Sequence, residues 1–145
     1  MSDRINLRKL APDAYKIMYN FEQYLAQSSL TDRHKELIKI RASQINGCAY
    51  CLDMHTKDAR NAGESEQRLY LLSAWRETSL FTNEEKAILA LTEEMTKIQN
   101  GVSEATYNRA LQLLGKEYLA EVMMAVIIIN AWNRIGVSTS LPLPD

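Results

Sequence analysis

The amino-acid sequence predicts an all-α protein, folded as a compact helical bundle of about six to seven helices. Apolar residues recur at spacings of three and four along most of the chain, which is the period of an amphipathic helix. Residues that cap or stop helices separate these segments, and no stretch of useful length alternates apolar and polar residues as a strand would. The 145 residues contain no visible internal repeat and no low-complexity linker, so residues 1–145 are expected to form a single domain.

The first third of the chain is predicted to hold an N-terminal arm and two helices. Residues up to Pro12 are expected to form an arm or loop. An amphipathic helix is expected over residues 13–27, before a run of polar residues that breaks it. Thr31 and Asp32 can cap a second helix over about residues 33–44. The buried stripe of that helix is expected to contain Leu37, Ile40 and Ile45.

Five further helices are predicted, over about residues 48–61, 65–77, 82–99, 103–114 and 117–135. Ala62-Gly63 is a good C-cap for the first of these, and Thr82 with Glu85 fits a capping box. The last helix is apolar nearly all round in its middle, so it should be buried within its own domain or against another subunit. The helix over 65–77 is expected to turn Leu69, Leu72, Ala74 and Trp75 inward.

Composition and charge exclude several classes of partner. Net charge is −1 with acidic and basic residues interspersed, and no stripe of Lys and Arg marks a nucleic-acid-binding face. The N-terminus lacks the apolar core of a signal peptide. The longest apolar run, Val122 to Ile129, falls short of the ~20 residues that span a bilayer. A cytoplasmic protein without nucleic-acid or membrane partners is expected.

The chemistry of the chain is concentrated in one C-x-x-C motif. Cys48 and Cys51 are the only cysteines, and they follow the helix-stopping pair Asn46-Gly47. They are therefore expected on the first turn of a helix, where free backbone N–H groups and the helix dipole favour a thiolate. His55 lies four residues past Cys51, on the same helical face. In a reducing compartment such a pair is catalytic or metal-binding more often than structural.

A redox role for the pair requires a source of protons. Closing a disulfide over so short a loop adds little stability, so the bond would be useful for opening and closing. Lowering a thiol pKa from ~8.5 to ~6.5 raises the thiolate fraction at pH 7 about 25-fold. The less basic thiolate is also a weaker nucleophile, which lowers the rate roughly eightfold. Positioned proton transfer must therefore supply further rate enhancement, and His55 is one proton donor within reach. A carboxylic acid is the natural second member; Glu36 is the candidate, although periodicity leaves open whether it faces the cysteines or solvent.

Together these residues resemble the signature of a known family, the AhpD-like alkylhydroperoxidases of the carboxymuconolactone decarboxylase superfamily. The resemblance covers most of the chain from about Glu36 onward. Its motifs are Glu36, Ala42-Ser43, Asn46-Gly47-Cys48, Tyr50-Cys51, His55 and the segment Asn130-Ala131-Trp132-Asn133-Arg134-Ile135-Gly136.

The resemblance implies an all-α fold that assembles as trimers or hexamers and a peroxide-reducing dithiol cycle. By carry-over, Cys51 is the peroxidatic cysteine that becomes a sulfenic acid, and Cys48, expected to be the more exposed of the two, resolves it to a disulfide. His55 and Glu36 form the proton relay. A dithiol donor, such as a lipoyl-bearing protein, then reduces the disulfide, so neither a cofactor nor a metal is expected.

One position departs from the best-known antioxidant members of the family. They have a relay histidine just before the second cysteine, where this chain has Tyr50. A tyrosine can hydrogen-bond and donate a proton, but a pKa near ~10 makes it a poor shuttle at neutral pH. Tyr50 is therefore a candidate site residue whose role differs from that of the histidine.

Three other interpretations of the motif remain open. Cys48, Cys51 and His55 could bind zinc with His34 or Glu36 as a fourth ligand, as a redox-responsive or zinc-binding interaction module. The cysteines could be buried apolar residues. A carboxymuconolactone decarboxylase-like enzyme is the third alternative, although those enzymes lack the cysteine pair.

Of the polar residues in the last helix, Asn130 and Asn133 need partners if buried, across a subunit interface or at a neighbouring helix end, and Arg134 is expected to pair with an acidic residue.

Overall fold

The computed structural model describes residues 3–144, and every regular element in that range is helical. The elements are α1 (Leu7–Leu10), α2 (Pro12–Gln27), α3 (Asp32–Asn46), α4 (Ala49–Asn61), α5 (Glu66–Tyr70), the 3-10 helix η1 (Leu72–Glu77), α6 (Asn83–Thr96), the 3-10 helix η2 (Ile98–Asn100), α7 (Glu104–Leu114) and α8 (Lys116–Thr139). Six α-helices have at least eleven residues, which confirms the predicted all-α bundle.

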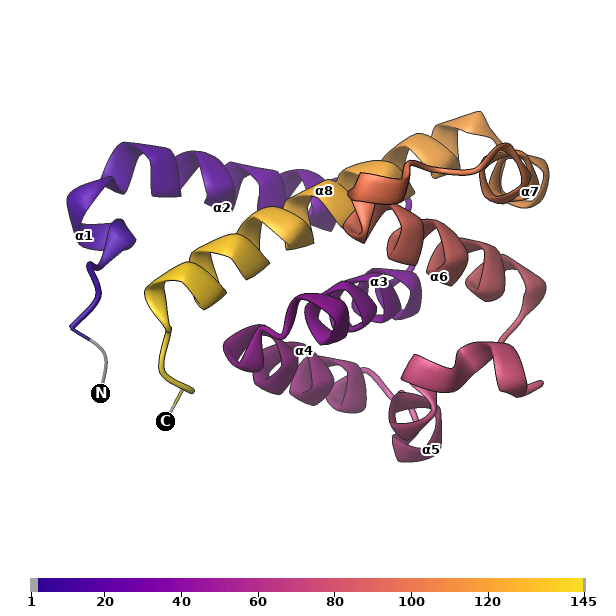
Figure 1. Ribbon diagram of the computed structural model, residues 1–145, viewed down its shortest axis with the longest axis horizontal. Helices are drawn as coiled ribbons and strands as arrows, with labels where there is room; N and C mark the ends of the chain where they lie inside the picture. Colours follow the sequence, from indigo (N-terminus) through magenta and orange to yellow (C-terminus); the bar gives the residue numbers. More distant parts are fainter. Residues whose placement is uncertain (1–2, 145) are drawn as a thin grey trace.

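Helix α3 is the centre of the bundle. It packs against α4, α6 and α8, while α2 lies along the outer side of α8 and α7 packs against α6 and α8 (Figure 1). Within α3 the side chains of Leu37, Ile38 and Ile40 are 0–1% exposed, because neighbouring helices cover several of its faces. The two ends of the described chain lie at the same end of the molecule, beside α1 and the C-terminus of α8 (Figure 1).

Two apolar clusters build the core on either side of α3. The larger one joins α3 to α6 and α8 through residues such as Ile38, Ile88 and Ile129. The smaller one joins α3 and α4 to η1 and includes Leu72 and Trp75. The cysteine motif lies at the turn from α3 to α4, so both helices are anchored in these clusters before the chain reaches it.

The local signals for helix ends are confirmed. The Thr31 and Ser103 hydroxyls accept hydrogen bonds from backbone N–H groups three residues on, at 3.1 and 3.2 Å. Both halves of the Thr82–Glu85 capping box form, at 3.1 and 2.8 Å. Gly47 has φ +68°, the left-handed conformation that ends a helix without a Cβ penalty. These contacts join neighbours in sequence, which is why sequence alone predicts them.

Four predicted elements need correction. The N-terminal arm contains α1, capped by Asn6, whose side chain accepts from the Lys9 N–H at 3.0 Å; four residues are too few for periodicity to show. Residues 65–77 form α5 and η1 instead of one helix: α5 ends with Leu71 as its C-cap, and η1 is itself kinked at Ala74, which has the non-helical angles φ −119° and ψ 28°. Ala74 is therefore exposed and not inward. The predicted 82–99 helix ends earlier, as α6 and η2, and α8 runs on to Thr139.

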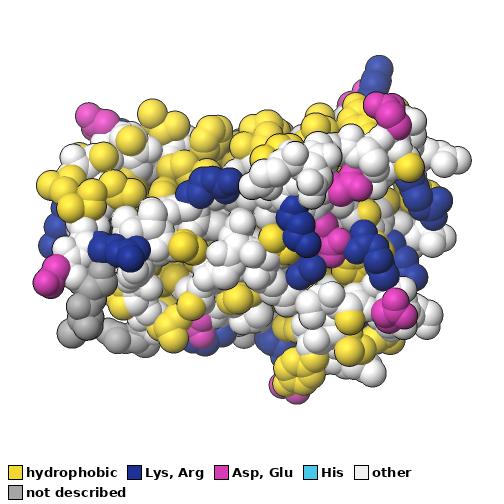
Figure 2. All heavy atoms as spheres, viewed as in Figure 1, with side chains coloured by type: hydrophobic (Ala, Val, Ile, Leu, Met, Phe, Trp, Pro, Cys, Tyr) yellow, Lys and Arg dark blue, Asp and Glu magenta, His cyan; other side chains and the backbone are white. Residues whose placement is uncertain are grey.

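Apolar side chains remain on the outer surface of α2 and α8. Among them, Ile17 is 58%, Phe21 37% and Tyr24 42% exposed on α2, and Ile127 is 48% exposed on α8. Figure 2 shows hydrophobic side chains gathered along this edge of the molecule. By length and composition alone α8 also meets the requirement for a membrane span, as central helices of folded cores often do; eight of its residues are buried here.

Candidate active site

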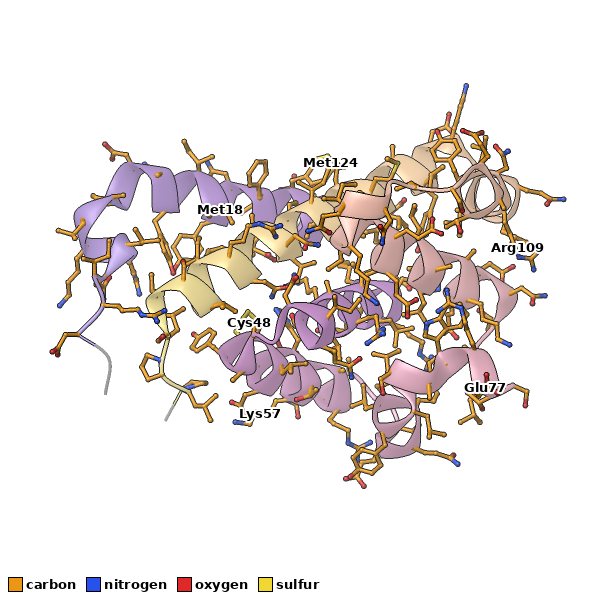
Figure 3. The ribbon with its side chains drawn as sticks, viewed as in Figure 1. Met18, Cys48, Lys57, Glu77, Arg109 and Met124 are labelled. Carbon is orange, nitrogen blue, oxygen red and sulfur yellow. A yellow bond between two sulfur atoms is a disulfide. The ribbon has the colours of Figure 1, made fainter. Side chains whose placement is uncertain are left out.

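The cysteine pair forms a disulfide at the start of α4. Cys48 is the N-cap of the helix, and its Sγ accepts a hydrogen bond from the Cys51 N–H at 3.3 Å. The two Cα atoms are 5.3 Å apart, within the usual range for a disulfide. Figure 3 shows Cys48 at the turn that begins α4, facing α8. The prediction that the pair lies at a helix start and can close locally is confirmed.

Helix α8 covers the disulfide. A Cβ atom added to Gly136 would lie 2.7 Å from Cys48 Sγ and 3.7 Å from Cys51 Sγ, so only glycine lets α8 approach this closely. As a result Cys48 is 1% and Cys51 4% exposed. The expectation that Cys48 is the more exposed cysteine is wrong, because it considered the start of α4 and not the helix that packs over it.

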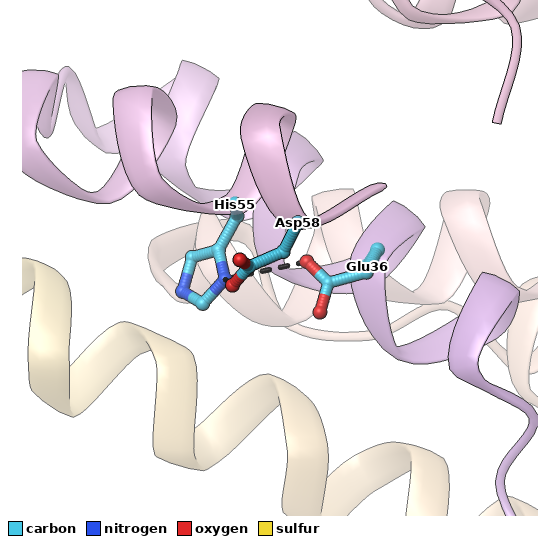
Figure 4. Close-up of side chains that lie close together, drawn as sticks. All are labelled: Glu36, His55 and Asp58. Carbon is cyan, nitrogen blue, oxygen red and sulfur yellow. Dashed lines mark ion pairs between the residues drawn. The ribbon is translucent and has the colours of Figure 1, made fainter. Parts of the chain in front are cut away.

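His55 and Glu36 face each other across the α3–α4 pair. His55 Nδ1 lies 3.3 Å from Glu36 Oε2, and their side chains are 8% and 16% exposed. Both atoms are buried, and neither has a hydrogen-bond partner among residues 3–144. Figure 4 shows Glu36 pointing at the histidine, with Nε2 on the side of the ring away from it. The structure thus answers the open question about Glu36, which faces the site and not solvent.

Asp58 is a third member of this cluster, and sequence analysis missed it. Its Oδ2 lies 3.9 Å from His55 Nδ1, one helical turn further along α4, and its side chain is 56% exposed. The ligand atoms of Glu36, His55 and Asp58 all lie within 4.8 Å of one another. The i, i+3 spacing of His55 and Asp58 was the available signal.

A cavity of about 500 Å³ opens beside the disulfide. Cys51 lines it and Cys48 does not; Tyr50, Met54, His55 and Asp58 are its other wall residues from α4. Its opposite wall is aromatic: the Trp132 ring lies 5.4 Å from Tyr15 and 5.7 Å from Tyr19, centroid to centroid. The cavity is therefore mostly apolar, with the sulfur of Cys51 and the polar groups of α4 on one side.

Two further features give the cavity its electrostatic character. Glu22 on α2 accepts from Trp132 Nε1 at 3.0 Å and lies 3.3 Å from Lys39 Nζ, so these two charges form an ion pair in the cavity wall. Partial burial, with the neighbouring Tyr19 and Tyr50, raises the pKa of Tyr15, and its phenol stays protonated at neutral pH. Tyr50 is half-buried and lines the same cavity.

A chain of amides fixes α8 against α3 near the disulfide. Asn133, fully buried, donates to Ser43 Oγ at 2.9 Å, and Asn46 donates to Asn133 and Asn130 at 2.9 Å each. The expected partners therefore lie on α3 within the same chain, and not across a subunit interface. Arg134 donates to the Asn130 carbonyl at 3.1 Å and has no acidic partner among residues 3–144.

The zinc site proposed from the cysteines is not assembled in this structure. The two sulfurs are bonded to each other. His34 lies toward the opposite end of α3, where its Nδ1 is 2.6 Å from the Tyr118 hydroxyl. Burial lowers the pKa of His34, so this histidine is neutral at pH 7. It supports the packing of α3 on α8 rather than the site.

Comparison with known families decides the classification. The model of the carboxymuconolactone decarboxylase family matches residues 12–94, which include Glu36, both cysteines and His55. The chain belongs to the carboxymuconolactone decarboxylase family. Within that superfamily its structural relatives are AhpD-like, as the sequence motifs predicted.

Three relatives place the chain more closely. It is 45% identical over 139 residues to the uncharacterized protein YdfG of Bacillus subtilis, covering 95% of both. A protein of unknown function from Agrobacterium tumefaciens, suggested to be an antioxidant defence protein AhpD, superposes with a TM-score of 0.95 at 39% identity over 99% of both chains. An uncharacterized peroxidase-related protein with an AhpD core, from Ralstonia eutropha, gives 0.81 at 17% identity, covering 95% of this chain and 74% of that one. The last likeness shows the fold alone.

Proposed function

We propose that the protein is a thiol-dependent peroxidase that reduces alkyl hydroperoxides or hydrogen peroxide through a Cys48–Cys51 dithiol–disulfide cycle. The observation that carries the proposal is the position of Cys51. It is the cysteine that lines the cavity, and His55 lies beside it on the same wall. The AhpD-like fold and the close-spaced cysteine pair support the same class of chemistry.

In the first step the Cys51 thiolate attacks one peroxide oxygen and the O–O bond breaks. Cys51 becomes a sulfenic acid, and the other oxygen leaves as an alkoxide or hydroxide that requires a proton. His55 supplies it through Nε2, while Nδ1 faces the Glu36 carboxylate 3.3 Å away. Glu36 thereby selects the tautomer and stabilises the imidazolium that donates the proton. Tyr50, on the cavity wall, is placed to orient the peroxide.

In the second step the Cys48 thiolate attacks Cys51 Sγ and forms the disulfide, and the sulfenic oxygen leaves as hydroxide, which takes up a proton to become water. Its position as N-cap of α4 holds its sulfur next to Cys51 throughout, so resolution needs no unfolding of the helix. A dithiol donor, such as a lipoyl-bearing protein, then reduces the disulfide to two thiols and is itself oxidised to a disulfide. The cycle uses no cofactor beyond the two cysteines.

The proposed setting is the cytoplasm, and the proposed assembly is a homo-oligomer, a trimer or hexamer. The outer apolar residues of α2 and α8 support self-association, because such patches usually mark an interface. Ile17→Glu, in this patch, should dissociate the assembly in light-scattering measurements. Lys16→Glu, a charge change on the same helix, is the control.

Peroxide turnover with a dithiol reductant tests the cycle. Cys51→Ser should abolish it, and full activity in this variant would contradict the proposal. Cys48→Ser should leave a sulfenic acid on Cys51 that dimedone traps as an adduct detectable by mass spectrometry. A sulfenic acid trapped on Cys48 in the Cys51→Ser variant would reverse the two roles.

The family match also favours one alternative, a carboxymuconolactone decarboxylase-like activity. That reaction needs no thiol. It should therefore persist in the Cys48→Ser/Cys51→Ser double variant, measured as CO₂ release, whereas peroxide reduction should not. Counting free thiols before and after one equivalent of peroxide, alongside a metal analysis, separates the peroxidase from a redox-responsive or zinc-binding interaction module.

A further inference from the structure

We propose that Glu36, His55 and Asp58 form a binding site for a transition-metal dication, best matched by Zn²⁺. The ligands are one imidazole nitrogen and two carboxylate oxygens, without sulfur. The proposal has a second part, which rests on the proposed function: an ion in this site blocks peroxide reduction by occupying the His55–Glu36 pair.

The spacing of the three ligand atoms fits a zinc site. Zn–N and Zn–O bonds of about 2.0–2.2 Å in tetrahedral geometry place neighbouring ligand atoms roughly 3.4 Å apart. His55 Nδ1 and Glu36 Oε2 are 3.3 Å apart, at this value (Figure 4). His55 Nδ1 and Asp58 Oδ2 are 3.9 Å apart and need only a small approach. Asp58 can provide it, since its side chain is 56% exposed.

Unsatisfied buried atoms point to a ligand at this place. Buried polar atoms in folded proteins almost always have hydrogen-bond partners. His55 is 6% exposed, and its Nδ1 and the Glu36 Oε2 that lies 3.3 Å away are both buried and have no hydrogen-bond partner in residues 3–144. A dication between them satisfies both at once. His55 Nδ1 and Glu36 Oε2 lie on the side of the His55 ring that also faces Asp58.

Charge and ligand type determine which ions fit. Two carboxylates converge on one imidazole, and no lysine or arginine among residues 3–144 forms an ion pair with Glu36 or Asp58. A dication would therefore enter a site with uncompensated negative charge. The imidazole favours zinc, cobalt or nickel over magnesium and calcium, which prefer oxygen alone. His55 and Asp58 also line the cavity, so a water molecule can complete the coordination.

Zinc in this site would stop the proton relay. Metal binding uses the Nδ1 lone pair and requires neutral imidazole and ionised carboxylates. His55 then has no Glu36 carboxylate to stabilise its charged form, so it no longer delivers a proton to the departing oxygen. The ion would act as a reversible inhibitor that binds without touching either sulfur.

Metal titration of the disulfide form tests the site directly, because closed cysteines cannot contribute thiolates. Calorimetry with ZnCl₂ should give one site per chain. Co²⁺ should give visible d–d bands without sulfur-to-cobalt charge transfer. Asp58→Asn should weaken binding by at least about 10- to 100-fold. Asp53→Asn, on the same helix but paired with Lys57, is the matched control and should bind normally.

Each outcome decides the proposal. Absence of binding to the oxidised protein, or unchanged affinity in Asp58→Asn, overturns it. In the reduced enzyme, inhibition by Zn²⁺ is measured relative to each variant's own turnover without the ion, and Asp58→Asn should lose this inhibition; inhibition that persists in Asp58→Asn assigns it to the cysteines and overturns the second part. If zinc binds as described but wild-type protein reduces no peroxide, the site stands and the proposed function fails.

Discussion

Glu93 and Glu36 are both largely buried glutamates on helices that pack together, but their surroundings differ. Glu93, on α6, accepts hydrogen bonds from Trp75 Nε1 at 2.8 Å, from Arg41 Nε at 3.0 Å and from Arg76. Glu36, on α3, forms one ion pair among residues 3–144, with a histidine nitrogen at 3.3 Å, and its buried oxygen has no hydrogen bond within that range.

The difference separates a structural carboxylate from one available for chemistry. Burial alone would raise the pKa of Glu93, but its three donors outweigh burial and hold the pKa below its ordinary value. Glu85 is similar: Arg68 and the Thr82 N–H outweigh burial and lower its pKa. Carboxylates whose two oxygens both accept hydrogen bonds stabilise helix packing. A carboxylate left open can bind a proton or an ion.

The largest expected effect comes from Glu36→Gln, which keeps the shape but removes the charge. Peroxide turnover should fall by about 10²–10⁴, the usual size of a general acid–base contribution. Stability should change by less than about 1 kcal/mol, because no hydrogen bond to the buried oxygen is lost. Steady-state kinetics and urea unfolding measure the two quantities. Unchanged turnover would mean that Glu36 has no part in the relay.

Glu93→Gln should show the reverse pattern. Removing the charge leaves Arg41 without its buried partner, which should cost roughly 3 kcal/mol of unfolding free energy. The folded fraction should keep its turnover, because Glu93 does not line the cavity. Urea unfolding followed by circular dichroism gives the loss. If Glu93→Gln were no less stable than Glu36→Gln, the distinction between the two glutamates would be wrong.

Gly136→Ala extends the comparison from charge to packing. The added Cβ would lie 2.7 Å from Cys48 Sγ. Overpacking costs about 1–3 kcal/mol, but alanine regains about 1 kcal/mol of helix propensity, so the net loss of stability should be small. The displaced Cys48 should instead resolve the sulfenic acid more slowly, measured as a longer-lived dimedone-reactive species. Val137→Ala, next on the helix and exposed, should resolve at the normal rate.

The smallest expected effect is on the stability of the fold at low pH. Because the folded-state pKa values of Glu85 and Glu93 are lowered from 4.5, the stability they contribute is complete above about pH 4.5. It is lost as the pH falls through the lowered values. Urea unfolding between pH 3 and 7 should therefore show constant stability from these groups at the top of the range and a decline at the bottom. The decline should be shallower in Glu93→Gln than in the wild-type protein.

Local features of the fold were predictable because local contacts cause them. Thr82 and Glu85 are three residues apart, and their capping box depends on little else. The same holds for the cysteine pair, whose closure requires only the first turn of α4. The Ala74 kink and helix α1 were missed because neither breaks the 3.6-residue pattern over a long enough stretch to show.

The features of the site that were missed depend on contacts between distant segments. Cys48 is covered because Gly136, 88 residues later, packs over it, and no periodicity in α4 reports that. The side on which Glu36 points depends on how α3 and α4 cross. Only the family resemblance predicted that the Glu36 side chain faces the site, and the structure shows that the packing of α3 on α4 places it 3.3 Å from His55. Asp58 was overlooked because an exposed aspartate on a helix is ordinary by sequence.

The N-cap position of Cys48 also makes the state of the cysteine pair observable from the backbone. Its Sγ accepts the Cys51 N–H at 3.3 Å in the disulfide, and a thiolate is a stronger acceptor of the same bond. The Cys51 amide proton is therefore a reporter of electron flow through the protein. Its resonance and its exchange rate with solvent should change each time the pair opens and closes, which allows turnover to be followed by NMR without a label on either sulfur.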